Sequence, residues 1–342
     1  MSESNKILSK RQLITIGVIF IAVLIIGIIF LALGFNEAFY SESSTVRSIF
    51  KVITFLGDPI VFIVMVAIFF IVYDKRFAKN LALSLLYTVY LNEFLKNIFQ
   101  DPRPLSNTDP GEITPENPDG LIETSYGFPS AHTQSAVATW GYIAYEFREK
   151  LYFVIVMGIL IFLIAISRMI IGVHDLEDVI GGFLIGLGIL VLFINLEPYG
   201  SKQFNKLNLP VKLIIVIITS LFLFLLGILL FPTSYLNLLP TPPAFTDTGR
   251  FAQVCGVMLG LGIGYVLENE YINYEPSKLT LKWKIINLII GLVIIFVVYF
   301  ALEAFRGVFD SVFYRYIRYA IIGFILSYLV PFILIKLNKS KQ

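Results

Sequence analysis

"IGVIFIAVLIIGIIFLALGF", residues 16–35, is a run of 20 residues without a polar side chain. At about 1.5 Å per residue, a helix of this length spans the roughly 30 Å hydrocarbon core of a bilayer. The chain has 342 residues, of which 57% are hydrophobic and 15% charged, and its mean hydropathy is +0.82. Soluble domains usually carry about a quarter charged residues. We therefore expect an integral membrane protein.

Nine further apolar segments predict additional spans near residues 59–73, 78–98, 130–146, 151–171, 176–195, 211–231, 250–267, 285–303 and 313–335. The pattern predicts an all-α fold, a polytopic membrane helix bundle of about ten transmembrane helices. The breaks between segments divide it into a six-span core, residues 1–200, and a four-span extension, residues 201–342. Residues 100–128, rich in proline and acids, are expected to form an external loop.

Lysine and arginine indicate the orientation. With a cytoplasmic N-terminus, 17 of the 26 basic residues fall in cytoplasmic segments, which places both termini inside.

The single cysteine, Cys255, has no partner for a disulfide or a cysteine metal site. The net charge is +2 and no basic tract is present, so the sequence predicts no nucleic-acid partner.

The stretch "KNIFQDPRP", residues 96–104, places Lys96 and Arg103 where the third predicted span ends. Pro102 and Pro104 stop the helix and stiffen the chain beyond it. A lysine at the end of a span commonly extends toward the lipid headgroups. Lys96 alone therefore does not indicate a site.

The stretch "YGFPSAHTQSA", residues 126–136, begins the fourth predicted span. Pro129 suits a first helical turn and Ser130 can cap the helix, so free N–H groups and a positive dipole end face outward. Such a helix terminus binds anions. His132 lies near this terminus and, taken alone, is equally consistent with an interfacial histidine bonded to a neighbour.

The stretch "SRMIIGVHDLEDVIGG", residues 167–182, joins the fifth predicted span to the sixth. Arg168 closes the fifth span, and Gly172 allows a tight turn. His174 and Asp178 are four residues apart, so they share one face of a helix. Asp178 can then accept a hydrogen bond from one imidazole nitrogen and leave the other nitrogen free to attack.

The three stretches contain both histidines of the chain and all end at the predicted external face. Three cations, a helix N-terminus, two histidines and one orienting acid make a site for a phosphoryl group. No external cluster has recognisable metal-ligand spacing, so arginine and lysine would neutralise the phosphate, and we expect neither metal nor cofactor. Asp175 and Glu177 fit first-turn positions that the helix dipole favours.

These motifs resemble the type 2 phosphatidic acid phosphatase superfamily, whose members share K-x6-R-P, P-S-x-H and S-R-x5-H-x3-D. Here the motifs run from Lys96 to Pro104, from Pro129 to His132 and from Ser167 to Asp178, with matching spacing. The resemblance covers roughly residues 12 to 195, the first six predicted spans. Ala131 stands where most members have glycine, and its methyl group would narrow the phosphate site.

The resemblance implies a role for each motif residue. His174 would be the nucleophile that forms a phosphohistidine, held by Asp178, and His132 would protonate the leaving oxygen and later activate water. The phosphate oxygens would be held by Lys96, Arg103, Ser130, Ser167 and Arg168. The residues alone indicate the same roles for His174, Asp178 and the cations, but they do not order the two histidines.

We therefore expect a membrane-integral lipid phosphatase of the plasma membrane, with its active site on the external face. It would hydrolyse a phosphomonoester or pyrophosphate of a lipid, so its partners would be this lipid and the bilayer. We also expect that it can form a homo-oligomer. Phosphatidates, polyprenyl phosphates and sphingoid phosphates are all candidates. An external site favours a polyprenyl carrier, whereas the four additional spans resemble the layout of sphingosine phosphate phosphatases.

Two alternatives remain. In a phosphotransferase, an alcohol would take the phosphoryl group from His174 in place of water, and the motifs do not distinguish this reaction from hydrolysis. An anion or lipid transporter is also compatible with ten spans, but the predicted site lies at one surface, without obvious charges at the midplane of broken helices. The haloperoxidase chemistry of soluble superfamily members fits an embedded chain less well.

Overall fold

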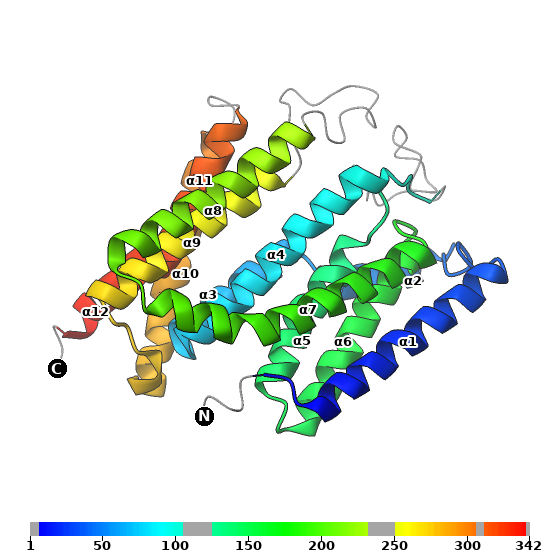
Figure 1. The fold of residues 1–342 in the computed structure, drawn as a ribbon, viewed down its shortest axis with the longest axis horizontal. Coiled ribbons are helices and arrows are strands. Elements are labelled where there is room, and N and C mark those ends of the chain that lie inside the picture. Colours follow the sequence, from blue (N-terminus) through cyan, green and yellow to red (C-terminus); the bar gives the residue numbers. More distant parts are fainter. Residues whose placement is uncertain (1–6, 105–124, 232–249, 306–310, 340–342) are drawn as a thin grey trace. The chain divides into compact units, whose positions relative to one another are not determined.

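The computed structural model describes residues 7–104, 125–231, 250–305 and 311–339, and within these ranges it is helical and contains no strand (Figure 1). Most of the predicted external loop, residues 105–124, therefore lies outside the described residues. The helices are α1 (Lys10–Ala32), α2 (Ser44–Phe55), α3 (Pro59–Val72), α4 (Lys75–Phe99), α5 (Ala131–Glu146), α6 (Leu151–Ile170), α7 (Leu176–Asn205), α8 (Leu209–Leu230), α9 (Phe251–Tyr271), α10 (Leu281–Ala304), α11 (Val312–Phe324) and α12 (Val330–Lys339). A short 3₁₀ helix, η4 (Pro276–Lys278), precedes α10, and a π-helical turn, η5 (Ile325–Leu329), joins α11 to α12.

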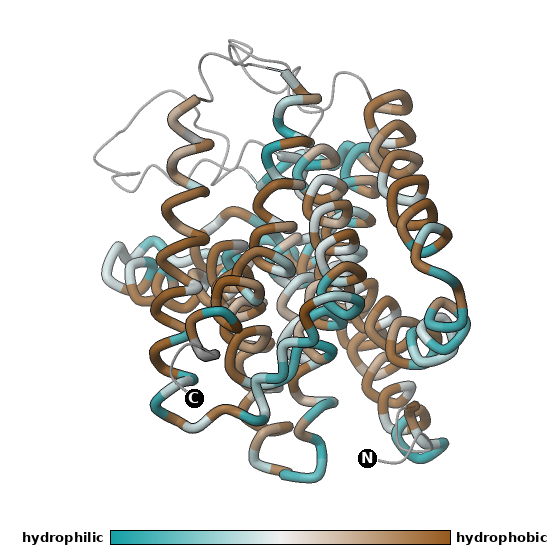
Figure 2. Tube along the Cα trace, turned by 90° about the vertical axis from the view of Figure 1, so that its left-hand side faces the viewer, coloured by the Kyte–Doolittle hydropathy of each residue, from teal (hydrophilic) through white to brown (hydrophobic). Residues whose placement is uncertain are grey.

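Eight helical segments of the described ranges are long and apolar enough to cross a membrane, and the chain is a multi-pass integral membrane protein. Figure 2 shows hydrophobic residues along most of the length of the long helices. Two of the ten predicted spans, 78–98 and 130–146, form helices that are not among the eight. Helix α5 has only 16 residues, and α4 carries several charged side chains. Both bury polar side chains inside the fold, which keeps their mean hydropathy low.

The chain divides into two compact units. The first comprises residues 1–61 and 87–199, and the second comprises residues 62–86 and 200–342. Residues 62–86 thus belong to the second unit, although they precede residue 200, where the sequence predicts the division. All three motifs of the predicted site lie in the first unit.

Close contact between α5 and α7 organises the first unit. A Cβ atom at Gly182 would lie 2.7 Å from the carbonyl oxygen of Ser130, and one at Gly186 would lie 2.8 Å from that of Gln134. Small residues four apart let two membrane helices approach at backbone distance. The N–H of Ser130 also donates a hydrogen bond of 2.9 Å to the carbonyl oxygen of Asp178. The start of α5 is therefore fixed against the first turn of α7.

The second unit is built around α9 and α11, which approach through glycines of α9 that face the backbone and side chains of α11 and η5. Cys255 is buried in this core, and its carbonyl oxygen accepts a hydrogen bond of 2.7 Å from Ser220. At the other end of α9, the buried carboxylate of Glu268 pairs with Lys75 at 2.7 Å and accepts the N–H of Tyr274 at 2.6 Å. These contacts stabilise the second unit, which contains none of the three motifs.

Candidate active site

His174 lies in the turn between α6 and α7. Gly172 has a φ of 77°, a left-handed conformation that favours glycine, so the expected tight turn is confirmed. The N–H groups of Val173 and His174 both donate to the carbonyl oxygen of Arg168, each at 3.2 Å. The backbone of the turn thus ties His174 to the end of α6.

The imidazole of His174 bonds to Asp178, as predicted, although His174 lies in the turn just before α7 and only Asp178 lies in the helix. Nδ1 of His174 lies 2.7 Å from Oδ2 of Asp178, and both side chains are buried. Nη1 of Arg103 lies 2.8 Å from Nε2 on the other side of the ring. Arginine can only donate, so Nε2 must be the acceptor and Nδ1 must carry the proton. This assigns a neutral imidazole whose Nε2 lone pair points away from Asp178.

Arg103 is held in place by the chain on both sides of it. Its Nε donates to the carbonyl oxygen of Ser125 at 2.7 Å, and its Nη2 donates to the hydroxyl of the same serine at 2.8 Å. Nη1 also donates to the carbonyl oxygen of Val173 at 2.5 Å. The guanidinium therefore connects the segment before α5 to the turn that carries His174.

The other two cations are buried nearby. Lys96, in the last turn of α4, donates through Nζ to the carbonyl oxygen of Gly127 at 2.9 Å and to that of Tyr126. Arg168, in the last turn of α6, donates through Nη1 to the hydroxyl of Thr54 at 3.0 Å. Both charges are thus held by the protein, and cations fixed in this way stabilise negative charge that develops on a nearby oxygen.

The electrostatic surroundings keep His174 neutral. Burial lowers the pKa of His174 well below its usual value, and the charges of Arg103, Lys96 and Arg168 act in the same direction. A neutral imidazole at neutral pH is the form that can attack an electrophile. Burial raises the pKa of the neighbouring Asp175 to about 6, so this carboxylate is ionised above that pH.

His132 is the second residue of α5 and faces the C-terminal end of α2. A Cβ atom at Gly57, just beyond α2, would lie 3.2 Å from Cδ2 of His132 and 3.3 Å from the carbonyl oxygen of Thr54. Because Thr54 also accepts from Arg168, the end of α2 contacts elements of both the second and the third motif. The charge of His132 also reaches His174, since it lowers the pKa of that residue.

The two motif serines are fully buried, and their hydroxyls bond within their own helices. Ser130 caps α5 as expected: its Oγ accepts from the N–H of Thr133 at 3.5 Å and from the hydroxyl of Thr133 at 3.1 Å. Ser167 donates to the carbonyl oxygen of Ile164 at 2.6 Å. Both serines therefore shape the helix ends, and their contact with phosphate stays a prediction.

Several residues around the site were not indicated by the sequence. Asn36, which follows α1, accepts the N–H of Leu176 at 3.0 Å through its carbonyl oxygen and the N–H of Glu177 at 3.1 Å through Oδ1. Its Nδ2 donates to Oδ2 of Asp175 at 3.1 Å. Asn36 therefore caps α7 from a distant part of the chain. Thr54 and Ser125 likewise hold arginines of the site, and no local pattern singles them out.

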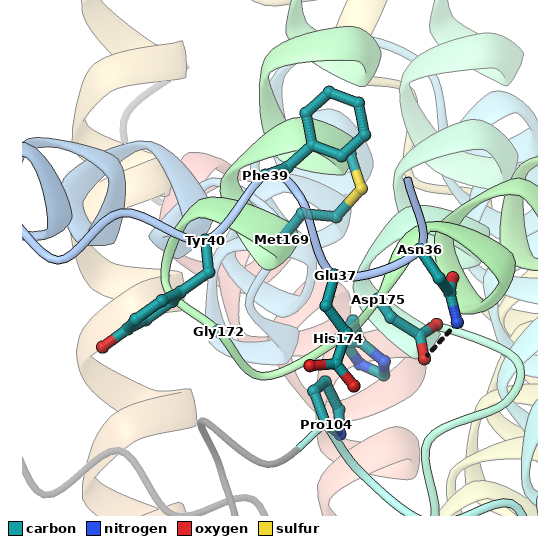
Figure 3. A pocket seen from close by; sticks show the side chains of 9 residues that line it. All are labelled: Asn36, Glu37, Phe39, Tyr40, Pro104, Met169, Gly172, His174 and Asp175. Carbon is teal, nitrogen blue, oxygen red and sulfur yellow. Dashed lines mark hydrogen bonds between the residues drawn. The ribbon is translucent and has the colours of Figure 1, made fainter. Parts of the chain in front are cut away.

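A pocket of about 260 Å³ opens beside His174 (Figure 3). It is lined by the loop after α1, by Pro104, by the end of α6 and by the turn that carries His174, namely Asn36, Glu37, Phe39, Tyr40, Pro104, Met169, Gly172, His174 and Asp175. The pocket thus borders the turn that carries His174, whose side chain is itself buried. Within the described ranges, no three His, Cys, Asp or Glu side chains are grouped as metal ligands would be.

Comparison with known proteins identifies the family. Residues 77–202 match the PAP2 superfamily, and residues 252–342 match the transmembrane extension of PAP2 superfamily phosphatases. The chain belongs to the PAP2 superfamily. The first match contains all three motifs, from Lys96 to Asp178. The resemblance seen in the sequence is therefore confirmed, and the C-terminal helices also have counterparts among superfamily phosphatases.

Relatives within this superfamily are lipid phosphatases. Sphingosine-1-phosphate phosphatase 1 of Rattus norvegicus is 25% identical over 321 residues, which are 82% of this chain and 70% of the rat protein. Undecaprenyl-diphosphatase of Sulfolobus acidocaldarius is 26% identical over 174 residues, 49% of this chain and 81% of the relative. The crystal structure of a transmembrane PAP2-type phosphatidylglycerolphosphate phosphatase from Bacillus subtilis matches with 22% identity and a TM-score of 0.39, covering 55% of this chain and 96% of that one.

Proposed function

We propose that the chain is a lipid phosphatase that works through a phosphohistidine on His174. The observation that carries this proposal is the Nε2 lone pair of His174, which is directed by Asp178 on one side and faced by Arg103 on the other. A buried nucleophile between an orienting acid and a phosphate-binding cation is the arrangement that covalent phosphoryl transfer requires.

In the first step, Nε2 of His174 attacks phosphorus, and the bond between phosphorus and the lipid oxygen breaks. Protonated His132 gives its proton to that leaving oxygen. In the second step, His132 takes a proton from water, the hydroxide attacks phosphorus, and the bond between phosphorus and His174 breaks. Arg103 would move from Nε2 to a phosphate oxygen as the substrate binds, beside Lys96 and Arg168.

The substrate we propose is a lipid with a terminal phosphate or pyrophosphate. The membrane-spanning helices would keep its apolar tail in the bilayer while the phosphate reaches the ends of α4 and α6. One relative is named for a sphingoid base phosphate and another for a polyprenyl diphosphate. These names support a lipid substrate for this chain but do not distinguish between the two classes.

The distribution of lysine and arginine supports a site on the external face of the plasma membrane, with both termini in the cytoplasm. Lys96 and Arg168, which are buried, and the half-buried Arg103 support hydrolysis without a metal, because they supply the positive charge that a metal would otherwise provide. Homo-oligomerisation stays a prediction.

A substrate panel tests the proposed function. The protein in liposomes would be given phosphatidate, a polyprenyl pyrophosphate, a sphingoid phosphate and a soluble sugar phosphate, with phosphate release as the readout and His174→Ala as the inactive control. We expect at least one lipid to exceed the sugar phosphate by about tenfold or more, because each buried methylene contributes about 0.8 kcal/mol and tenfold requires about 1.4. A sugar phosphate hydrolysed as fast as every lipid would contradict the lipid assignment.

A further inference from the structure

The pocket beside His174 is acidic. Among the residues that line it, the carboxylic acids are Glu37 and Asp175, and no lysine or arginine belongs to the lining that the structure describes. In Figure 3 the carboxylate of Glu37 points toward His174 and Pro104. A substrate phosphate bound at His174 would therefore meet Arg103 at Nε2 and would lie beside a pocket that carries two carboxylates.

The loop that carries Glu37 is anchored at both ends. Asn36 bonds to the first turn of α7 through its carbonyl oxygen and its side chain, as described above. At the other end, the N–H of Ser41 donates to the carbonyl oxygen of Ile170 at 3.2 Å. Glu37 lies between these two anchors, so its position beside the nucleophile is set by the fold.

The two acids of the pocket differ in their bonding. Both oxygens of Asp175 accept hydrogen bonds of 3.1 Å, Oδ2 from Asn36 and Oδ1 from the N–H of Asp178. Asp175 is therefore an internal cap of α7. The side chain of Glu37 is exposed, and in the described part of the chain its carboxylate has neither a hydrogen bond nor an ion pair. Glu37 is thus the acid that is placed to meet a ligand.

An exposed carboxylate next to a phosphate site repels a phosphate dianion unless the substrate itself brings a cation. We propose that Glu37 binds an ammonium group of the substrate, and that the preferred substrates are lipid phosphates with a protonated amine close to the phosphate. Arg103 and its neighbouring cations would take the phosphate of this zwitterionic headgroup. This inference rests on the proposed function and specifies the substrate class of the same site.

A polyprenyl phosphate has no cation to pair with Glu37. The inference therefore favours amino-lipid phosphates over the polyprenyl carriers suggested by an external site, and the two substrate classes should respond oppositely when Glu37 is neutralised. Phe39, Tyr40 and Met169 supply the apolar part of the same pocket, against which the carbon atoms next to the amine can pack.

The test uses two lipids that differ in one group, a long-chain 2-aminoalkyl phosphate and the 2-hydroxyalkyl phosphate of the same length. Their kcat/KM values would be measured in detergent at pH 7.5 for the wild type, for Glu37→Gln and for Glu42→Gln. Glu42 is an exposed acid of the same loop that does not line the pocket, so it is the matched control.

We expect the wild type to prefer the amine by about fivefold, the scale of a well-placed exposed ion pair. Glu37→Gln should lower kcat/KM for the amine and raise it for the hydroxy lipid, while Glu42→Gln keeps the wild-type ratio. High salt should reduce the preference of the wild type but not that of Glu37→Gln. A ratio that Glu37→Gln leaves unchanged would overturn the inference, although hydrolysis of both lipids would still support the proposed function. Failure of the wild type to hydrolyse either lipid would also overturn the inference, whereas the proposed function would be contradicted only if the polyprenyl pyrophosphate and the other lipids of the substrate panel were not hydrolysed either.

Discussion

Replacing Asp178 with asparagine tests how the nucleophile is oriented. Asparagine has the same shape, and Asp178 is fully buried, so the substitution keeps the packing of α7. In the wild type, Oδ2 of Asp178 accepts the proton of Nδ1 at 2.7 Å. The asparagine side chain can instead present its NH₂ group to Nδ1, which would place the imidazole proton on Nε2. The lone pair that must attack phosphorus would then be lost.

The expected loss follows from the role of Asp178. An acid that fixes the reactive tautomer of a histidine and stabilises the cation formed on it contributes a factor of roughly 10⁴ in the serine protease triad. This factor corresponds to about 5.5 kcal/mol of transition-state stabilisation. Because Asp178 is the group bonded to Nδ1, we expect a decrease in kcat of this size, with a smaller change in KM.

The assay is steady-state phosphate release from a lipid phosphate in detergent, combined with thermal unfolding to show that the variant is folded. Glu177→Gln is the matched control, because Glu177 precedes Asp178 in the first turn of α7, whereas Nδ1 of His174 bonds to Asp178; the kcat of this variant should stay within about twofold of wild type. Asp178→Asn with more than a tenth of the wild-type kcat would refute the assigned role of Asp178.

Three further predictions concern the pKa of His174, helix packing and metals. The His132→Gln variant retains a single histidine, His174. Its imidazole should stay neutral at pH 6, because burial and the nearby cations lower its pKa, and NMR can follow its titration. A titration midpoint at or above pH 6.5 would be inconsistent with the site. Gly182→Ala should destabilise the protein by roughly 1 to 3 kcal/mol in thermal unfolding, because its Cβ would lie 2.7 Å from the carbonyl oxygen of Ser130. Gly188→Ala on the same helix, with nothing within 4 Å, should not destabilise it. Hydrolysis should persist in excess EDTA, and a loss of activity that Mg²⁺ reverses would contradict hydrolysis without a metal.

Local patterns were sufficient to predict much of this molecule. Apolar runs located the other α-helices but not α2, because membrane spans need about 20 apolar residues and α2 has only 12 residues. The spacing of His174 and Asp178 predicted their hydrogen bond, and Gly172 predicted the turn before them. Each of the ten predicted spans falls on a helix, but two of these helices are not long and apolar enough to be recognised as spans by themselves. Helix α4 is lined by buried polar residues and α5 is short, so both fall outside the hydropathy and length criteria that the other helices satisfy.

The supporting contacts could not be predicted from local patterns, because they join segments that lie far apart in the sequence. Asn36, which caps α7, bonds to Asp175, 139 residues further along the chain. Thr54 accepts a hydrogen bond from Arg168, 114 residues further along. Neither residue belongs to a motif. Glu37 is likewise an unremarkable acid in a loop until the fold places it in the pocket beside His174.

Direct detection of phosphohistidine tests the central claim. The wild type would be mixed with a ³²P-labelled lipid phosphate, stopped in base within one turnover, and the labelled residue identified by mass spectrometry. Phosphohistidine survives base and is lost in acid, which distinguishes it from a phosphoserine. We predict base-stable, acid-labile label on His174 that forms before free phosphate and is absent in His174→Ala. Release of phosphate without label on His174, or label on another residue, would contradict the mechanism.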